Sequence, residues 1–340
     1  MECGQRSMES LEMKNFWQDR RIFITGASGL VGGWLIHKLL ENQADVVILL
    51  RDWIPGSNLI TSKLLEKVKI VRGDLSNPKS LERILAEYET QSVIHLAAQT
   101  IVPIANNNPL STFESNIAGT WNLLEACKSI KTIQSIVVAS SDKAYGDPVI
   151  LPYTEDMPLN AIYPYDVSKA CSDMISVSYA KTFNMPISIT RCGNFFGGGD
   201  LNWNRIIPGT IRSIIRGQAP IIRSDGTLIR DYIYVEDAVS AYIALSKALS
   251  LDVNLKGEAF NFSNETQINV LDLTNIIINI LGSNLKPIVQ GNNHGEIKAQ
   301  YLDSTKARNI LNWQPKYGLE EGLEKTVLWY KNYLENIKHD

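Results

Sequence analysis

The sequence predicts an α/β fold in which a Rossmann-type doubly wound parallel sheet is followed by a smaller mixed α/β C-terminal substrate domain. In the first half of the chain, short β-branched runs alternate with helix-length amphipathic segments, which is typical of buried parallel strands joined by crossover helices. After Arg191 this alternation breaks down, and a glycine-rich loop precedes a helix-like stretch at 207–216 and mixed short elements. The six expected strands are 21–25, 45–50, 68–71, 92–96, 135–140 and 186–190.

The length of 340 residues predicts about two domains. We expect a nucleotide-binding domain over 15–191 plus about 233–255, and a substrate domain over about 192–232 plus 256–335. Residues 1–14 read as a polar N-terminal tail. In this division the segment at 232–237 (YIYVED) returns the chain to the large sheet before the smaller domain resumes.

The charge balance indicates which partners to exclude. Lys plus Arg number 33 and Asp plus Glu 36, a net charge of −3, which argues against a nucleic-acid-binding surface. The sequence has no apolar run near the roughly 20 residues that a membrane span needs, and no signal-like N-terminal stretch. The four cysteines and four histidines show no ligand spacing. We therefore predict a cytoplasmic protein with reduced thiols and no metal site.

A glycine pattern directly after the first strand predicts a dinucleotide site. Gly26, Gly29 and Gly32 lie in the sequence TGASGLVG, and a helical segment follows. Small residues allow a tight turn in which backbone N–H groups approach a pyrophosphate, and the positive end of the helix faces the anion. Ser28 and Leu30 belong to the same turn and are predicted to contact the cofactor.

Two later strand ends support the same cofactor. Asp74, with Leu75 beside it, follows the third strand, where a carboxylate can accept a hydrogen bond from an adenine amino group. Ala97 and Ala98 follow the fourth strand, where small side chains allow close backbone approach. These four residues are predicted to line an NAD or NADP site.

The end of the second strand bears on the choice between NAD and NADP. A carboxylate there holds the ribose hydroxyls of NAD, whereas an arginine accommodates the 2′-phosphate of NADP. The sequence places Arg51 and Asp52 side by side at this point. Each supports a different cofactor, and both alternatives stay open.

A tyrosine and a lysine spaced for one helix face predict redox chemistry at a sugar carbon. Tyr165 and Lys169 are four residues apart. An ammonium group beside a phenol favours the phenolate, which can take a proton from a sugar hydroxyl. Ser141, after the fifth strand, completes a predicted Ser–Tyr–Lys triad.

With these motifs, the chain resembles the extended short-chain dehydrogenase/reductase family and, within it, the nucleotide-sugar epimerases and dehydratases, from about residue 15 to about residue 330. The resemblance implies a Rossmann-type domain, a small substrate domain, a tightly bound NAD or NADP, and a homodimer or tetramer. The segments that carry it are TGASGLVG, HLAAQ, SSDKAYG, YPYDVSK, RCGNFFGGGD, RIIPGTIR, SDGTLIRDYIYVED and LDSTKARNILNWQP.

The residues after the triad serine distinguish the branches of that family. Epimerases tend to carry small residues there, whereas this chain has Asp142 and Lys143, as in CDP-glucose 4,6-dehydratases. The resemblance implies that Asp142 protonates the hydroxyl leaving carbon 6, and that Lys143 removes the carbon 5 proton or stabilises the enolate. A UDP-glucose 4-epimerase-like activity remains an alternative. So does GDP-mannose 4,6-dehydratase, because the ending LLRDW is similar to that of the NADP-using enzymes.

Four further residues are predicted to contact a nucleotide diphosphate sugar. The resemblance places Asn194 and Arg230 at the diphosphate and Gln99 at the sugar, while Arg205 is a candidate for the nucleotide end. Arginine suits forked contacts with phosphate. A turn-capping Asn, rim arginines and a Gln bonded to backbone are the purely structural alternatives for these positions.

Overall fold

The computed structural model describes residues 15–147, 150–292 and 297–337, so the predicted N-terminal tail at 1–14 lies outside the described residues. The chain divides into two compact units. The first contains the described residues of Met1–Ser140 together with Tyr163–Thr190 and Ala241–Ala259. The second contains those of Ser141–Ile162, Arg191–Ser240 and Phe260–Asp340.

A seven-stranded sheet with the order β10-β6-β5-β4-β1-β2-β3 organises the first unit. The neighbouring pairs from β3 to β6 are parallel. Its strands are β1 (Arg21–Thr25), β2 (Asp45–Leu50), β3 (Lys69–Arg72), β4 (Ser92–His95), β5 (Ser135–Ala139), β6 (Ile187–Cys192) and β10 (Ala259–Phe262). Because these strands are parallel, their carboxyl ends meet at one edge, where ligands bind in open α/β sheets.

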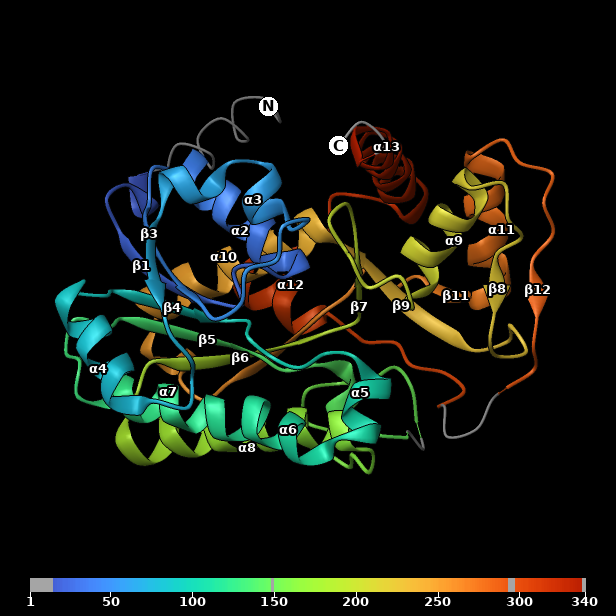
Figure 1. Ribbon diagram of the computed structural model, residues 1–340. Coiled ribbons are helices and arrows are strands. Elements are labelled where there is room, and N and C mark those ends of the chain that lie inside the picture. Colours follow the sequence, from blue (N-terminus) through green and yellow to red (C-terminus); the bar gives the residue numbers. More distant parts are fainter. Residues whose placement is uncertain (1–14, 148–149, 293–296, 338–340) are drawn as a thin grey trace, which may run out of the picture. The chain divides into compact units, whose positions relative to one another are not determined.

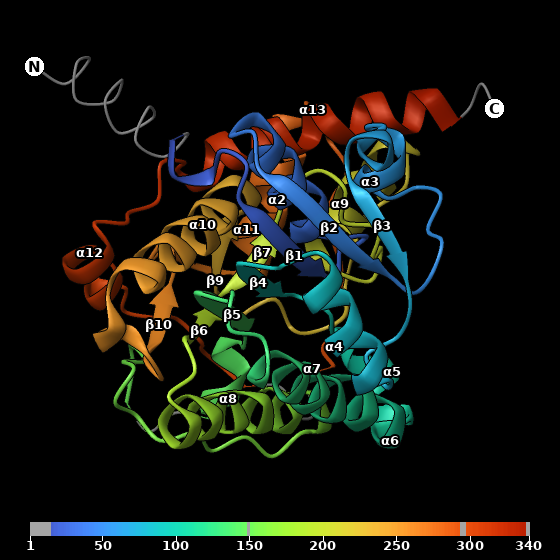
Figure 2. The same ribbon diagram turned by 90° about the vertical axis from the view of Figure 1, so that its left-hand side faces the viewer.

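Helices cover both faces of this sheet (Figures 1 and 2). They are α2 (Leu30–Glu41), α3 (Asn58–Thr61), η1 (Leu64–Lys67), α4 (Pro78–Glu87), α5 (Val102–Asn107), α6 (Pro109–Phe113), η2 (Glu114–Ala118), α7 (Gly119–Lys128), α8 (Pro164–Phe183), α10 (Val235–Leu251) and η4 (Val253–Leu255). In Figure 1, α2 and α10 lie on one face, and α4, α7 and α8 lie on the other. The apolar runs of β1, β2, β4, β5 and β6 are therefore buried, whereas the edge strand β3 is mostly exposed.

The core of the first unit explains why its strands are continuous apolar runs rather than alternating apolar and polar residues. Phe23, Val93 and Ile136 from three strands are fully buried, and they pack in one cluster with Leu85 of α4 and Leu123 of α7. Burying a side chain of this size stabilises the fold by about 1.5–3 kcal/mol. Among the described residues, no helix combines the length and apolar character that crossing a bilayer requires.

The second unit contains small sheets and their helices. A three-stranded sheet has the order β11-β9-β7, and β8 pairs with β12. Helices α9 and α11 contact each other beside these strands (Figure 1). The elements of this unit are η3 (Asp142–Tyr145), β7 (Asn194–Phe196), α9 (Ile206–Ile215), β8 (Ile221–Ile222), β9 (Ile229–Tyr234), β11 (Gln267–Asn269), α11 (Val270–Ile280), β12 (Ile288–Val289), α12 (Thr305–Leu311) and α13 (Leu319–Ile337).

The predicted elements agree with the observed ones except at one chain segment. The strands predicted at 21–25 and 45–50 have the observed bounds, and the other four are displaced by one or two residues at one or both ends. The prediction that 232–237 returns the chain to the large sheet is wrong. Residues Ile229–Tyr234 form β9, which pairs with β7 and β11, and the chain rejoins the large sheet only at β10. An apolar run of this kind fits either sheet, so the sequence pattern does not distinguish them.

Candidate active site

The glycine turn between β1 and α2 leaves no room for side chains. Gly26 has φ of 76°, and a Cβ atom there would lie 2.7 Å from the Ala97 nitrogen. A Cβ atom on Gly32 would lie 2.3 Å from the Gly26 carbonyl oxygen. Helix α2 begins at Leu30, and Gly29 is its N-cap residue. Half-buried Ser28 completes the turn. The backbone N–H groups of a long helix thus begin in a cradle that fits a pyrophosphate.

His95, at the end of β4, organises the strand ends next to this cradle. The Ala97 N–H donates to Thr25 Oγ1 over 3.2 Å, and Thr25 Oγ1 contacts His95 Nδ1 at 2.7 Å. On the other side, His95 Nε2 contacts Thr120 Oγ1 at 3.1 Å, and that hydroxyl donates to the Asn116 carbonyl over 2.6 Å. Each hydroxyl has one proton, so Thr25 donates to Nδ1, and Nε2–H donates to Thr120. Burial, with the charge of Lys169, lowers the pKa of His95 to about 3.

Asn116 lies in η2, a single π-helical turn, and connects two predicted parts of the site. Its Oδ1 accepts a hydrogen bond from the Gln99 N–H over 2.7 Å, and its Nδ2 donates to the Gln99 carbonyl over 3.1 Å. The same Nδ2 donates to Ser168 Oγ over 2.9 Å. π-Helical turns are often found at functional sites. The sequence prediction does not include Asn116, which lies in none of its motifs, or His95, although His95 begins the motif HLAAQ.

Helix α8 carries Tyr165 and Lys169 one turn apart, as their spacing predicts. Tyr165 is half-buried in the first turn, and Lys169 is buried. The ammonium group of Lys169 donates to the Ala139 carbonyl at the end of β5 over 2.8 Å. Ser140 donates from its hydroxyl to the Lys169 carbonyl over 3.3 Å, and Ser141 is the next residue of the chain.

In the second unit, Ser141, Asp142 and Lys143 begin η3. Ser141 caps this turn: its Oγ accepts a hydrogen bond from the Lys143 N–H over 3.2 Å and donates to Asp142 Oδ1 over 2.9 Å. Asp142 is only 2% exposed. The Lys143 ammonium group donates to the side-chain oxygen of Gln300, which is fully buried. Buried Asp142 is thus bonded to half-buried Ser141, and half-buried Lys143 is bonded to a buried side chain. The sequence prediction does not include Gln300.

The residues predicted at the adenosine end lie at the ends of β2 and β3. Arg51 and Asp52 are exposed and form an ion pair of 2.7 Å, and Arg51 Nε also lies 3.9 Å from Asp74. A hydrogen bond from Ser76 chiefly lowers the pKa of Asp74. Leu75 is buried against α7, where its carbonyl accepts a hydrogen bond from Asn122 over 2.9 Å. Ala98, after β4, is half-buried.

The predicted substrate residues have local partners. Gln99 accepts a hydrogen bond from the Ile101 N–H with its side-chain oxygen, over 3.0 Å. Asn194 begins β7, Arg205 precedes α9, and Arg230 lies in β9.

The two arginines are held by different groups. Arg205 forms an ion pair of 2.9 Å with Asp200, which is almost fully buried. Buried Arg230 donates to the Ile229 carbonyl over 2.8 Å and to the Lys298 carbonyl over 3.4 Å. Within the part of the chain that the structure describes, no cluster of three or more His, Cys, Asp or Glu residues is arranged to hold a metal ion.

Comparison with known proteins identifies the family. A family model described as GDP-mannose 4,6 dehydratase matches residues 23–326. CDP-glucose 4,6-dehydratase of Salmonella typhimurium is 31% identical over 337 residues, covering 94% of this chain and 93% of that protein. The crystal structure of dTDP-glucose 4,6-dehydratase from Bacillus anthracis, in complex with NAD, superposes with a TM-score of 0.81 at 27% identity, covering 93% and 98% of the two chains.

The crystal structure of an epimerase is similar to this chain to the same degree. UDP-glucose 4-epimerase from Thermotoga maritima, solved with UDP-glucose, has a TM-score of 0.84 at 26% identity and covers 92% of this chain and 99% of its own. The family model and the curated relative each match most of the chain, and the solved structures share its fold. The chain therefore belongs to the NAD-dependent nucleotide-sugar epimerases and dehydratases of the extended short-chain dehydrogenase/reductase family.

Proposed function

We propose that this protein is a nucleotide-sugar 4,6-dehydratase, similar to CDP-glucose 4,6-dehydratase, that forms a nucleotide 4-keto-6-deoxyhexose. The observation that carries the proposal is the burial of Asp142 beside Lys143, directly after Ser141. A surface ion pair in a loop would be solvated and contribute little. An elimination needs an acid and a base in addition to the oxidation machinery, and this pair provides both residue types.

The cofactor of the proposal is NAD or NADP, held on the glycine turn. The absence of space for a Cβ atom at Gly26 and Gly32 supports backbone contact with the pyrophosphate. The nicotinamide supplies the hydride acceptor for carbon 4 and later the hydride donor for carbon 6. Arg51 suits NADP and Asp52 suits NAD, so the proposal includes both cofactors. The family resemblance and the NAD complex of the Bacillus anthracis relative favour NAD.

The chain's own residues perform the proton transfers. Tyr165 takes the proton of the carbon 4 hydroxyl, while Lys169 favours its phenolate and Ser141 donates a hydrogen bond to the same sugar oxygen. The resulting ketone makes the carbon 5 proton acidic. Lys143 removes that proton or stabilises the enolate, and Asp142 protonates the hydroxyl that leaves carbon 6.

A diphosphate-linked sugar is the substrate class of the proposal. Asn194 and Arg230 would bind the diphosphate, Arg205 the nucleotide and Gln99 the sugar. Cytidine is the base favoured by the similarity to the Salmonella protein. A homodimer or tetramer is the proposed assembly.

A 4-epimerase is the second candidate. The similarity to the Thermotoga maritima epimerase over almost the whole chain favours it. An epimerase returns the hydride to carbon 4 and needs no acid or base beside the triad, so it leaves Asp142 and Lys143 without a role.

Product mass distinguishes the two activities. The protein is incubated separately with CDP-, UDP-, dTDP- and GDP-hexoses, and the products are weighed by mass spectrometry. We expect loss of one water from one of these substrates. An unchanged mass together with a new sugar isomer would establish the epimerase instead.

A lysine variant tests the role of the pair. In Lys143→Ala, substrate should still reduce the cofactor, but deuterium exchange at carbon 5 in heavy water should be lost. Lys298→Ala, an exposed lysine close to Gln300 in the sequence, is the matched control and should exchange normally. Normal exchange in Lys143→Ala contradicts the assigned role.

A further inference from the structure

Gln300 is a fully buried residue whose amide side chain contacts Lys143 of η3. Its Oε1 atom accepts a hydrogen bond from the Lys143 ammonium group. Because an ammonium group donates hydrogen bonds and accepts none, the amide must turn its oxygen toward Lys143. The other end of the amide, Nε2, is also buried, and it has no hydrogen-bond partner among the described residues.

The unpartnered Nε2 atom indicates that stability does not explain why residue 300 is a glutamine. A buried N–H group without a partner has lost its hydrogen bonds to water and gained none in return. An apolar side chain of similar length would fill the same space without that cost. Groups that are unfavourable for stability are expected at functional sites. The contact with Lys143 is therefore the feature of Gln300 that calls for a functional explanation.

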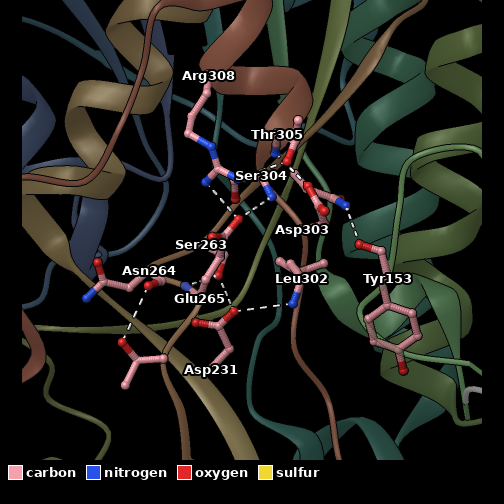
Figure 3. A network of polar contacts seen from close by, with 12 residues as sticks. Tyr153, Asp231, Ser263, Asn264, Glu265, Leu302, Asp303, Ser304, Thr305 and Arg308 are labelled. Atoms are coloured by element: carbon pink, nitrogen blue, oxygen red, sulfur yellow. Dashed lines mark hydrogen bonds and ion pairs between the residues drawn. The ribbon is translucent and has the colours of Figure 1, made fainter.

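Backbone pairing fixes the segment that carries Gln300. The Gln300 N–H donates a hydrogen bond to the Ile229 carbonyl of β9 over 3.1 Å. Further along, the Tyr153 N–H donates to the Tyr301 carbonyl over 3.0 Å, and the Asp303 N–H donates to the Tyr153 carbonyl over 2.9 Å (Figure 3). The segment therefore pairs with β9 at Gln300 and with Tyr153 immediately after it.

Asp231, a fully buried residue of β9, adds a side-chain anchor two residues after Gln300. Its Oδ2 accepts hydrogen bonds from the Leu302 N–H, over 3.3 Å, and from the Ser263 hydroxyl (Figure 3). One carboxylate oxygen thus joins three separate segments of the second unit. Because backbone and side-chain contacts both hold this stretch of chain, the Gln300 amide projects from a rigid support.

The turn η3 is joined to the same stretch of chain without the help of Lys143. Tyr145, two residues later, donates from its hydroxyl to Asn261 Oδ1 over 2.8 Å. Its ring stacks on that of Tyr153 with centroids 4.7 Å apart, and both rings pack against Leu302. Since Tyr145 already provides this connection, the Lys143 contact is not needed as a tether between the two segments.

We propose that Gln300 is a positioning residue for Lys143, and that it fixes Nζ for the proton transfer at carbon 5. The inference rests on the proposed dehydratase function and deepens it by naming the group that holds the base of the elimination. Charged or neutral, the lysine keeps an N–H group to donate to the amide oxygen. The nitrogen therefore stays in one place while the proton is taken and returned. A neutral acceptor does this without favouring the ammonium form, as a carboxylate would.

The proton transfer balances on the sugar and the lysine alone. Lys143 takes the carbon 5 proton, and the electron pair of the carbon 5–hydrogen bond passes into the enolate of the carbon 4 ketone. The reverse step returns the proton to carbon 5. Gln300 neither gains nor loses a proton, and it touches neither the sugar nor the cofactor in this scheme. It acts only through the position of Nζ.

Two substitutions at Gln300 separate positioning from packing. Gln300→Met keeps the length of the side chain and removes the acceptor, whereas Gln300→Glu keeps an acceptor oxygen and adds a buried charge. The measured quantity is deuterium exchange at carbon 5 relative to cofactor reduction by substrate, at the pH where each variant is fastest. Positioning predicts that this ratio falls by roughly 10- to 100-fold in Gln300→Met and stays near normal in Gln300→Glu.

A packing role predicts the opposite order. A buried charge is costlier than a thioether that fills the same space, so Gln300→Glu would then be the more damaged variant. That order, or equal losses in the two variants, would overturn the proposal. Gln218→Met, which changes an exposed glutamine of the same unit, is the matched control and should exchange normally.

Competitive labelling of lysines provides a readout that does not depend on activity. The protein is treated with a limiting amount of acetic anhydride, and the acetylation of each lysine is measured by mass spectrometry. An amine held on a buried acceptor should react more slowly than exposed Lys298. The reactivity of Lys143 should rise severalfold in Gln300→Met, while that of Lys298 stays constant. Equal reactivity of Lys143 in the natural protein and in Gln300→Met would overturn the proposal.

The two readouts separate the possible failures. A labelling change without elimination of water from any nucleotide sugar would support the contact but refute the dehydratase, and with it the role at carbon 5. Water elimination with a normal exchange ratio in Gln300→Met would refute the positioning role and leave the dehydratase standing. If Gln300→Met does not fold, Gln300→Asn decides, because it withdraws the oxygen by one methylene group and should show the same selective loss. A normal exchange ratio in Gln300→Asn would then contradict the proposal.

Discussion

The Nδ2 atom of Asn116 donates a hydrogen bond of 2.9 Å to Ser168 Oγ, and so joins the π-helical turn η2 to the helix that carries Tyr165 and Lys169. Asn116 is 2% exposed and also pairs with both backbone groups of Gln99. One side chain therefore holds three groups from two other segments of the first unit.

Asn116→Ala should destabilise the protein and slow oxidation at carbon 4. The substitution leaves buried polar groups unpaired, which costs about 1–3 kcal/mol of unfolding free energy. Urea unfolding and cofactor reduction by substrate measure the two effects. Asn42→Ala, which removes an amide bonded to the Lys38 carbonyl at the end of α2, should change stability by less than about 0.5 kcal/mol. Equal effects in the two variants would count against this role of Asn116.

Gln300→Glu should shift carbon 5 exchange to higher pH. Lys143 donates to the side-chain oxygen of Gln300, and a carboxylate in that place favours the charged ammonium. If neutral Lys143 is the base, the acid limb of the exchange rate plotted against pH should move to higher pH by about one unit or more. Deuterium exchange at carbon 5 against pH measures it. An unmoved limb would leave Lys143 as a stabiliser of the enolate rather than the base.

Gly32→Ala should abolish retention of the cofactor. The added methyl group would meet the Gly26 carbonyl and the backbone of Ala27, neither of which can move without opening the turn. Cofactor content after purification, read from absorbance, measures the loss. Gly318→Ala, where a Cβ atom meets nothing within 4 Å, is the control and should retain the cofactor. Full retention in Gly32→Ala would argue against the glycine turn as the site.

Asp231 and His95 should give opposite slopes to the dependence of stability on pH. The pKa of Asp231 is raised to about 7 in the fold, so between about pH 4 and 7 only the folded state holds this proton, and stability falls as pH rises, by roughly 4 kcal/mol. The pKa of His95 is lowered to about 3, so below about 6.5 the unfolded state binds the additional proton, and stability falls as pH falls.

Replacing Asp231 by Asn should reveal the histidine slope. The variant should be more stable than the natural protein above pH 7 and should lose stability more steeply on acidification, as urea unfolding across this range can show. Asp303→Asn serves as the control and should leave the slope between about pH 5 and 7 unchanged. A variant slope identical to that of the natural protein would contradict the raised pKa.

Arg51→Ala should weaken NADP binding more than NAD binding. Arg51 lies at the end of β2, paired with Asp52 and near Asp74, where a 2′-phosphate would displace a carboxylate as its partner. Titration with both dinucleotides measures the effect. Lys69→Ala, at the opposite end of the adjacent strand, should alter neither affinity. Equal weakening of NAD and NADP would remove Arg51 as a phosphate ligand.

The fold of the first unit could be predicted because its strands are continuous apolar runs. A strand buried on both faces needs no alternation, so β1 and β2 have the bounds that their sequences indicate. The sequence places 232–237 in the wrong sheet because an apolar pattern carries no information about which strand lies beside it.

The motif residues of the site could likewise be placed on their elements, but their supporting partners could not. Lys143 and Gln300 are 157 residues apart, and Asp231 and Ser263 are 32 apart. No local pattern encodes such contacts.

The hydrogen-bond chain through His95 has an evolutionary consequence. Its donors and acceptors run in one direction, from the Ala97 N–H through Thr25 and His95 to Thr120 and the Asn116 carbonyl. If His95 alone is replaced, the buried Thr25 hydroxyl loses its hydrogen-bond acceptor and the buried Thr120 hydroxyl loses its donor. Among relatives, Thr25, His95 and Thr120 should therefore be inherited as a set or replaced together.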